Sequence, residues 1–153
     1  MANTIKEQQD ILMKLNIHVL NPMQEEAISV IEQTTNTVLL SPTGTGKTLA
    51  FLLPLIKLLD PENKEVQALI IVPSRELAIQ IEQVVRSMGS GFKVNAIYGG
   101  RPMSKDKIEI KHVPAILIGT PGRIADHFSN NRFSKTRIKT LILDEFDKSL
   151  EDG

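Results

Sequence analysis

The chain has 153 residues, 41% of them hydrophobic and 24% charged, a composition typical of one globular domain with a single core. It contains no cysteine, which excludes disulfides and thiolate metal sites and favours a cytoplasmic location, and no apolar run approaches the roughly 20 residues of a membrane span. The formal net charge is zero, so any binding of a polyanion has to come from a local basic patch.

The predicted elements alternate between helices and strands along the chain. The first long helix covers residues 22–33, and its apolar stripe consists of Met23, Ala27, Val30 and Ile31. A second helix begins near Lys47, and Pro54 predicts a kink or an end within it. A third covers residues 76–88. Strands are predicted at residues 37–40, 68–72, 94–98, 115–118 and 140–143.

The strand composition predicts the fold class. Four of the five strands consist mostly of Val, Ile and Leu without polar alternation, which is typical of strands covered on both faces. Strands that alternate with helices predict right-handed crossovers. We therefore expect an α/β fold, a doubly wound and mostly parallel sheet flanked by helices. Residues 1–33 are expected to form a helical region, and residues 34–153 the core.

The segment after the first predicted strand has the composition of a phosphate-binding loop. It consists of Ser41, Pro42, Thr43, Gly44, Thr45, Gly46, Lys47 and Thr48. The glycines permit successive backbone N–H groups to face one point, which forms a seat for phosphate oxygens at a helix N-terminus. Lys47 is predicted to bind the β- and γ-phosphates of a nucleotide, and Thr48 to offer its hydroxyl to Mg²⁺. A purely structural glycine-rich turn is the alternative.

Two carboxylates, Asp144 and Glu145, follow the apolar strand at 140–143. In a doubly wound sheet this end of a strand faces the ligand crevice, and a buried carboxylate there needs a cation or a polar partner. We predict that Asp144 holds Mg²⁺ and that Glu145 orients or deprotonates the attacking water, with Lys47 as the third catalytic residue. A helix cap or a solvated turn is the alternative. The prediction requires both carboxylates to share one pocket with Lys47 and Thr48.

The order of the short motifs resembles that of the DEAD-box RNA helicase family over about residues 16–147. The motifs are Asn21-Pro22-Met23-Gln24, the loop 41–48, Pro73-Ser74-Arg75-Glu76-Leu77-Ala78, Gly99-Gly100, Thr120-Pro121-Gly122-Arg123 and Asp144-Glu145-Phe146-Asp147. The resemblance implies the ATP-binding, RecA-like first lobe of an ATP-dependent RNA helicase, with ATP and Mg²⁺ as cofactors and RNA as partner. It also implies that Gln24 recognises the edge of adenine, whereas the sequence alone favours an exposed helix residue there.

The resemblance further implies RNA binding on three loops. The residues concerned are Pro73, Arg75, Glu76, Gly99, Gly100, Arg101, Thr120, Pro121, Gly122 and Arg123. Because Arg75, Arg101 and Arg123 each follow a predicted strand, they can form a short basic rim against phosphates despite the zero net charge. Contacts to the RNA backbone predict little sequence specificity. Taken singly, each arginine also fits a solvated surface charge.

The chain departs from the family pattern in several places. Residues 16–20 lack the family's base-stacking aromatic, so we expect weaker adenine affinity. Phe146 stands where the family usually has Ala, and Ser74 where it has Thr. The chain also stops at Gly153, without the Ser-Ala-Thr strand and the second lobe that complete the family's cleft. We therefore expect an incomplete lobe with a gap in its sheet, and negligible ATP turnover by this chain alone.

Other kinds of site are less favoured by the sequence. The three histidines, His18, His112 and His127, lack metal-site spacing and are predicted to be surface or satisfied core residues. A nucleotide kinase would need an acceptor pocket and a lid, which the sequence does not show. A different P-loop NTPase, a DNA-directed motor and a non-catalytic nucleotide- or RNA-binding module stay as alternatives. Competition between RNA and DNA as activators, and the Glu145→Gln variant, discriminate among them.

Overall fold

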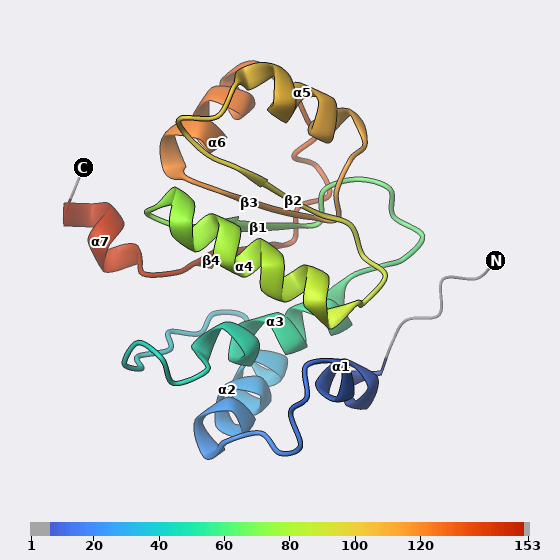
Figure 1. Ribbon diagram of the computed structural model, residues 1–153, viewed down its shortest axis with the longest axis vertical. Coiled ribbons are helices and arrows are strands. Elements are labelled where there is room, and N and C mark those ends of the chain that lie inside the picture. Colours follow the sequence, from blue (N-terminus) through green and yellow to red (C-terminus); the bar gives the residue numbers. More distant parts are fainter. Residues whose placement is uncertain (1–6, 152–153) are drawn as a thin grey trace.

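The computed structural model of the protein describes residues 7–151, with side chains as far as residue 148. Four parallel strands form its centre: β1 (Ala68–Ile71), β2 (Val94–Ile97), β3 (Ile116–Gly119) and β4 (Thr140–Leu143). They lie in the order β2-β3-β1-β4 (Figure 1). Ala68 of β1 aligns with Ile116 of β3 and with Thr140 of β4, so the strands end at one common edge of the sheet. The predicted parallel α/β fold is confirmed.

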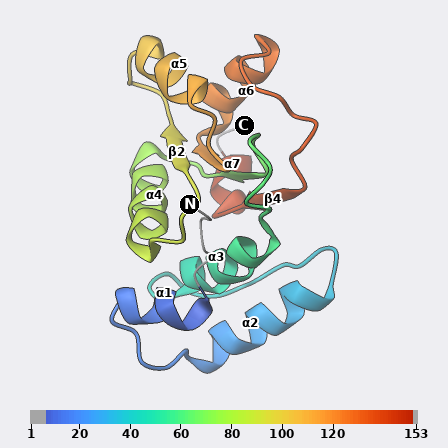
Figure 2. The same cartoon turned by 90° about the vertical axis from the view of Figure 1, so that its right-hand side faces the viewer.

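Seven helices in the described residues surround the sheet. They are α1 (Gln8–Lys14), α2 (Pro22–Gln33), α3 (Lys47–Leu58), α4 (Arg75–Met88), α5 (Met103–Lys111), α6 (Pro121–Ser129) and α7 (Phe146–Glu151). In Figure 2, α5 and α6 lie beyond one side of the strands and α1, α2 and α3 beyond the other. None of the helices in the described part of the chain has the length and apolar character needed to cross a membrane.

Each face of the sheet packs against its own set of helices. Ile70 and Ile118 point into a core shared with α1, α2, α3 and α4. Their neighbours Leu69 and Leu117 point the other way, into a smaller core formed with α5, α6 and Phe133. Because both faces of these strands are covered, the strands read as continuous apolar runs. The second core does not extend to β4, whose Leu141 is 58% exposed.

The strand predicted at residues 37–40 is wrong. This segment is irregular, Val38 and Leu40 are 75% and 84% exposed, and no other strand of the described chain pairs with it. A strand forms only where a neighbour bonds its N–H and C=O groups, and β4 is the outermost strand on that side of the sheet. The composition of residues 37–40 is typical of a strand, but the pairing partner that would fix this conformation is missing from the described fold.

Two helix predictions need smaller corrections. The stripe that α2 buries contains Gln24, Ala27 and Ile28, whereas Val30 is 40% exposed. The buried face of α2 is thus rotated relative to the predicted one. The reciprocal hydrogen bonds at the start of α2 account for this, because they turn Gln24 inward. Of the kink or end predicted at Pro54, the end is wrong, because α3 continues through Pro54 to Leu58. The predicted surface or core placement of the histidines is confirmed, since His18 and His112 are exposed and His127 is buried.

Candidate functional site

The phosphate-binding loop leads directly into α3. Gly44 and Gly46 have φ angles of 82° and 84°, a left-handed conformation that favours glycine over every other residue. Gly46 caps α3 without any side-chain hydrogen bond to the first turn. The N–H groups of that turn therefore remain available to an anion, and Lys47 is the first residue of the helix.

Two polar residues at the start of α2 hold this loop. The Asn21 side chain donates to the carbonyl oxygen of Thr45 at 3.0 Å, and the Gln24 amide donates to that of Gly46 at 3.1 Å. The Gln24 Oε1 atom accepts from the Asn21 backbone N–H at 2.9 Å. Gln24 is thus buried against the loop, and its amide keeps one N–H and one lone pair for a ligand. A Cβ atom at Gly46 would collide with the Gln24 side chain, so this contact also requires glycine.

The structure brings the loop lysine and the acidic strand end together. The Lys47 Nζ atom lies 3.7 Å from Oδ1 of Asp144, which is buried at the end of β4. The Asp144 backbone is fixed there because its N–H donates to the Ile71 carbonyl oxygen at 3.0 Å. Burial raises the pKa of the Asp144 carboxyl, and the nearby Lys47 ammonium partly opposes this. The loop and the carboxylate therefore meet on one side of the sheet, at the carboxyl ends of its strands.

Glu145 adopts a strained backbone conformation beside Asp144. Its φ angle is 49°, which is uncommon for a residue with a side chain. Its carboxylate is only partly exposed and lies 3.0 Å from Nζ of Lys148 in the next helix. Phe146, which follows, is 43% exposed. The turn from β4 into α7 thus places one carboxylate inside the site and the next at its border.

The acidic residues of the site suit a weakly held divalent cation. Among the described residues, no three His, Cys, Asp or Glu side chains gather as a metal cage. Mg²⁺ is commonly held by one or two carboxylates together with substrate phosphates and water. The buried Asp144 carboxylate and the Thr48 hydroxyl are oxygen donors of that kind, so the residues present fit Mg²⁺ that arrives with a nucleotide.

The three loops predicted to bind RNA lie together at the same edge of the sheet. Ser74 caps α4 by accepting from the Leu77 N–H at 3.2 Å, which places Arg75 in the first turn. The Arg75 side chain is 60% exposed, and its Nη1 would lie 3.4 Å from a Cβ added at Gly100. The loop after β2 is tied to α6 because Arg123 donates to the Arg101 carbonyl oxygen at 2.8 Å.

The other two arginines of these loops point inward. Arg101 donates to both carboxylate oxygens of Glu109, which raises the pKa of its guanidinium, and to the Ala96 carbonyl oxygen. Arg123 lies 3.3 Å from a carboxylate oxygen of the fully buried Asp106. Sequence reasoning missed Asp106, Glu109 and His127. Since Asp106 and Glu109 are three residues apart in a helix just after a strand, their shared helix face was the available signal.

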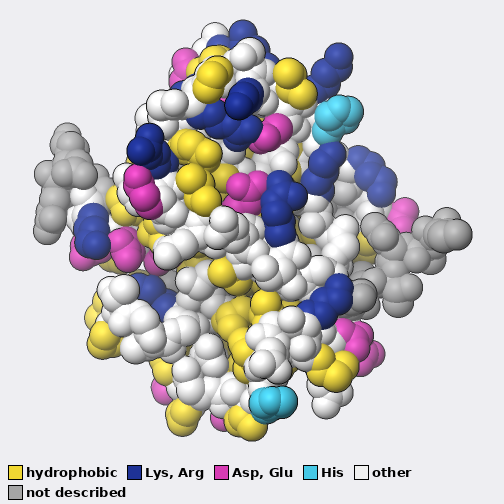
Figure 3. Space-filling model, viewed as in Figure 1, with side chains coloured by type: hydrophobic (Ala, Val, Ile, Leu, Met, Phe, Trp, Pro, Cys, Tyr) yellow, Lys and Arg dark blue, Asp and Glu magenta, His cyan; other side chains and the backbone are white. Residues whose placement is uncertain are grey.

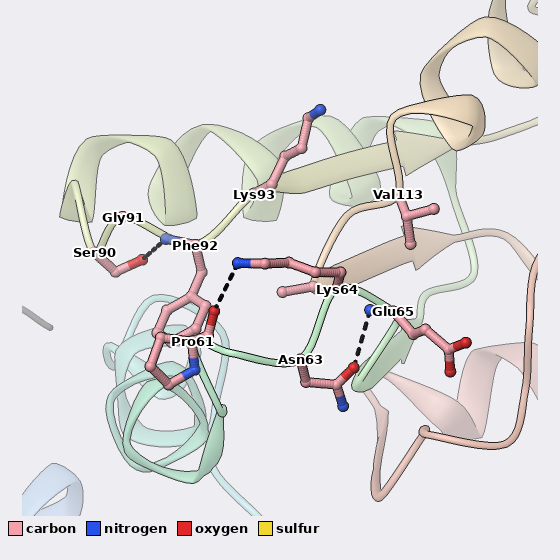
Figure 4. A pocket seen from close by; sticks show the side chains of 10 residues that line it. Pro61, Asn63, Lys64, Glu65, Ser90, Gly91, Phe92, Lys93 and Val113 are labelled. Atoms are coloured by element: carbon pink, nitrogen blue, oxygen red, sulfur yellow. Dashed lines mark hydrogen bonds between the residues drawn. The ribbon is translucent and has the colours of Figure 1, made fainter. Parts of the chain in front are cut away.

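A separate hollow lies at the opposite edge of the sheet. Figure 4 shows this pocket of about 380 Å³, which is lined by residues that precede β1, β2 and β3. Its polar residues include Lys64, which donates to the Pro61 carbonyl oxygen at 3.1 Å. No predicted site residue lines the pocket. On the face shown in Figure 3, Lys and Arg side chains are scattered among acidic ones, in keeping with the zero net charge.

Comparisons with known proteins agree with this geometry. A family model described as DEAD/DEAH box helicase matches residues 21–153. The chain is 41% identical to the ATP-dependent RNA helicase CshA of Limosilactobacillus reuteri over 86% of its own length and 27% of that protein. It is 40% identical to the probable ATP-dependent RNA helicase YfmL of Bacillus subtilis over 83% of its length and 34% of that protein. The chain thus spans about a third or less of these relatives.

Solved structures show the same fold. The yeast DEAD-box splicing factor Prp28 superimposes with a TM-score of 0.83 at 28% identity, over 99% of this chain and 38% of that one. A hypothetical ATP-dependent RNA helicase from Sulfolobus tokodaii gives a TM-score of 0.83 at 27% identity, over 96% of this chain and 44% of that one. With a family model matched over most of its length and this fold around it, the chain belongs to the DEAD/DEAH box helicase family.

Proposed function

We propose that this chain is the ATP-binding lobe of an ATP-dependent RNA helicase, which binds Mg–ATP and the RNA backbone. The observation that carries the proposal is the 3.7 Å contact between Lys47 and Asp144, which come from distant parts of the sequence. A glycine-rich loop that meets a buried carboxylate in this way is typical of proteins that bind nucleoside triphosphates.

The nucleotide lies along the loop of residues 41–48. Its phosphates accept from the backbone N–H groups of the loop and of the first turn of α3, and from the Lys47 ammonium. The Thr48 hydroxyl and the Asp144 carboxylate hold the cation that accompanies the phosphates. When bound, Mg²⁺ neutralises charge that develops on the transferred phosphoryl group. The raised pKa of Asp144 supports this role, because a buried carboxylate gains most from a nearby cation.

Glu145 and Gln24 complete the nucleotide site. Glu145 orients or deprotonates the attacking water from its position next to Asp144. Gln24 uses its remaining N–H and lone pair on the adenine edge, so its hydrogen bond to Gly46 links base recognition to the loop. ATP is therefore preferred over GTP, whose base presents a different pattern of donors and acceptors.

RNA crosses the loops that follow β1, β2 and β3. Arg75 offers an exposed guanidinium there, and Gly99, Gly100 and residues 120–123 offer backbone and hydroxyl groups. The closeness of Arg75 to Gly100, and of Arg123 to the Arg101 carbonyl, supports a single surface. Such contacts address phosphates and riboses, so binding depends little on base sequence.

Turnover requires a second RecA-like lobe that closes on the nucleotide and supplies cationic groups to the transition state. The chain covers only 27% and 34% of the two relatives, which leaves room for such a lobe. The absence of cysteine supports a cytoplasmic location.

Titration calorimetry of the chain with Mg–ATP and Mg–GTP tests the nucleotide proposal. We expect weak binding of ATP, weaker binding of GTP and loss of both in Asp144→Ala. Equal affinities for the two nucleotides would contradict the role of Gln24, and an unchanged Asp144→Ala variant would contradict the site itself. Steady-state ATPase assays with added RNA are expected to show negligible turnover. Robust stimulation of this chain alone would contradict the requirement for a second lobe.

A further inference from the structure

One buried carboxylate joins the loops that face RNA in the proposed function. Asp106, on α5, is fully buried, yet three side chains with positive or polar N–H groups surround it. Its Oδ2 atom lies 3.1 Å from Nε2 of His127 and 3.3 Å from Nη1 of Arg123, both on α6. Its Oδ1 atom lies 3.8 Å from Nε of Arg101 and has no hydrogen-bond partner among the described residues. Asp106 thus contacts the loop after β2 and the helix after β3.

The charges of this cluster balance. Arg101 and Arg123 contribute two positive charges, and Asp106 and Glu109 two negative ones. His127 adds polar contacts: its Nε2 lies 3.1 Å from Oδ2 of Asp106, and its Nδ1 lies 3.4 Å from Nη1 of Arg132. The buried Asp106 carboxylate is therefore compensated mainly by its two ion pairs with the arginines. Loss of any one of the four charges leaves a partner unbalanced.

The two arginines are occupied within the protein. Their side chains are only 17% and 12% exposed, against 60% for Arg75. Arg101 bonds Glu109 and the Ala96 carbonyl, and Arg123 bonds the Arg101 carbonyl in addition to Asp106. A phosphate would have to compete with the buried Asp106 for Arg123 and with the half-buried Glu109 for Arg101. Their geometry suits ties between loops. Arg75 pairs with the exposed Glu76 at 2.9 Å, and its own exposed guanidinium suits contact with a polyanion.

We propose that Asp106 is a positioning residue for RNA binding: it fixes Arg101 and Arg123 as internal ties, so that residues 99–103 and 120–123 form one preorganised surface. The proposal rests on the proposed function and deepens it, because it separates arginines that hold the surface from the arginine that meets phosphate. In this arrangement Arg75 carries the ionic contact. The backbone groups beside Gly100 and Thr120 are presented at fixed spacing, which lowers the entropy lost on binding.

The dependence of RNA affinity on salt separates the two kinds of arginine. The logarithm of the association constant falls linearly with the logarithm of the salt concentration. Each lost phosphate contact makes this slope less steep by about 0.7 for a single strand. Binding of a fluorescent oligouridylate to the chain is measured by anisotropy at several salt concentrations, well below the unfolding temperature. Arg75→Ala is expected to make the slope less steep by about 0.7, the value for one phosphate contact. Arg123→Ala and Asp106→Asn are expected to weaken binding about five- to tenfold with an unchanged slope, as when one buried charged partner is lost.

Three results of the binding experiment overturn the proposal. The first is a slope that falls as much in Arg123→Ala as in Arg75→Ala, which would show direct phosphate contact. The second is wild-type affinity in Asp106→Asn. The third is tighter, more salt-dependent binding by Asp106→Asn, which would show that Asp106 withholds its arginines from RNA.

Hydrogen exchange gives a readout that does not depend on RNA. In Asp106→Asn, amide exchange is expected to accelerate in residues 99–103 and 120–123 while residues 41–48 keep their wild-type rates. Uniform acceleration would show a merely structural role and overturn the proposal. If Asp106→Asn does not fold, Glu109→Gln at the half-buried end of the cluster takes its place with the same expectations. If the wild-type chain binds no RNA, the proposed RNA function fails, while local acceleration of exchange still supports the tie between the loops.

Discussion

The two halves of the binding edge are held by different interactions. The phosphate-loop half, residues 21–48 with Asp144, is fixed by neutral hydrogen bonds from Asn21 and Gln24 to backbone carbonyls, and the ion pair between Lys47 and Asp144 is long at 3.7 Å. The arginine half, residues 99–127, is fixed by ion pairs around the buried Asp106. Neutral amide contacts can break and reform at small cost, whereas a buried charge that loses its partner is strongly penalised.

This difference matches what each half binds in the proposed function, a nucleotide in one case and RNA in the other. A nucleotide must enter, be processed and leave, so its loop has to tolerate rearrangement. RNA bound by shape needs donors held at constant spacing. The phosphate-loop half also lies beside β4, the outer strand on that side of the sheet, where Val38 and Leu143 are exposed. The arginine half lies over β2 and β3, which pair with each other and are buried along their whole length.

The largest expected effect tests whether the two halves are independent. Lys47→Ala should weaken Mg–ATP binding about 100-fold, or about 2.7 kcal/mol, because it removes a charge-assisted bond to phosphate. RNA affinity should stay within twofold of the wild type, since Lys47 contacts no residue of the arginine half. Calorimetry and anisotropy measure the two affinities. Lys57→Ala, an exposed lysine in the same helix, serves as the control. A matching loss of RNA affinity would show that the halves are coupled.

The second prediction concerns packing in the arginine half. A Cβ added at Gly119 would lie 2.8 Å from the Ile97 carbonyl oxygen and 2.7 Å from the Ile124 side chain. Since backbone on a central strand cannot move away, Gly119→Ala should destabilise the protein by about 2 kcal/mol. Gly122→Ala, where no atom lies within 4 Å of the added Cβ, should change stability by less than about 0.5 kcal/mol. Chemical denaturation compares them, and equal stabilities would disprove the tight packing.

The sequence predicts those parts of the molecule that are specified locally. The glycine-rich turn and the start of α3 lie within a few positions of one another. The hydrogen bonds from Asn21 and Gln24 that hold this turn span more than 20 positions and were not predicted. The strands at residues 68–72 and 115–118 were predictable because a short, continuous apolar run is typical of a strand covered on both faces. The segment at 37–40 has the same composition, but a strand is defined by its neighbour, and the described fold supplies none.

The ion-pair cluster was beyond sequence reasoning for a related reason. Arg101, Asp106 and His127 meet only because β2 and β3 are adjacent and in register. Taken singly, Arg101 and Arg123 read as surface charges, and the prediction of a basic rim did not anticipate that both guanidinium groups point inward. Only the pairing of Asp106 with Glu109 on one helix face carried a local hint of the buried partners.

A smaller effect is expected at the contact between α2 and the phosphate loop. Asn21→Ala removes both the helix cap and the hydrogen bond to Thr45, so it should cost about 1 kcal/mol of stability. Because the loop would lose one of its two ties, Mg–ATP affinity should also fall a few-fold while RNA affinity stays constant. Thermal unfolding and calorimetry give both values. Asn36→Ala, an exposed asparagine outside any element, is the matched control. A change of RNA affinity in Asn21→Ala would contradict the separation of the halves.

The smallest effect, and the one with the most specific signature, is the pH dependence of Asp144. Its folded-state pKa is raised above the ordinary value of 3.8, chiefly by burial, so the folded protein holds this proton more tightly than the unfolded chain does. The stability from Asp144 is therefore fully present below pH 3.8 and is lost as the pH rises through the folded-state pKa. Asp144→Asn cannot ionise, so it should match the wild type in acid and exceed its stability at neutral pH by up to about 1 kcal/mol. Glu62→Gln, at an exposed turn, is the matched control. Denaturation midpoints against pH decide the matter: if the Asp144→Asn variant is less stable at neutral pH, then Lys47 holds the carboxylate more strongly than burial opposes it. The phosphate-loop half would then be fixed by an ion pair after all, as the arginine half is.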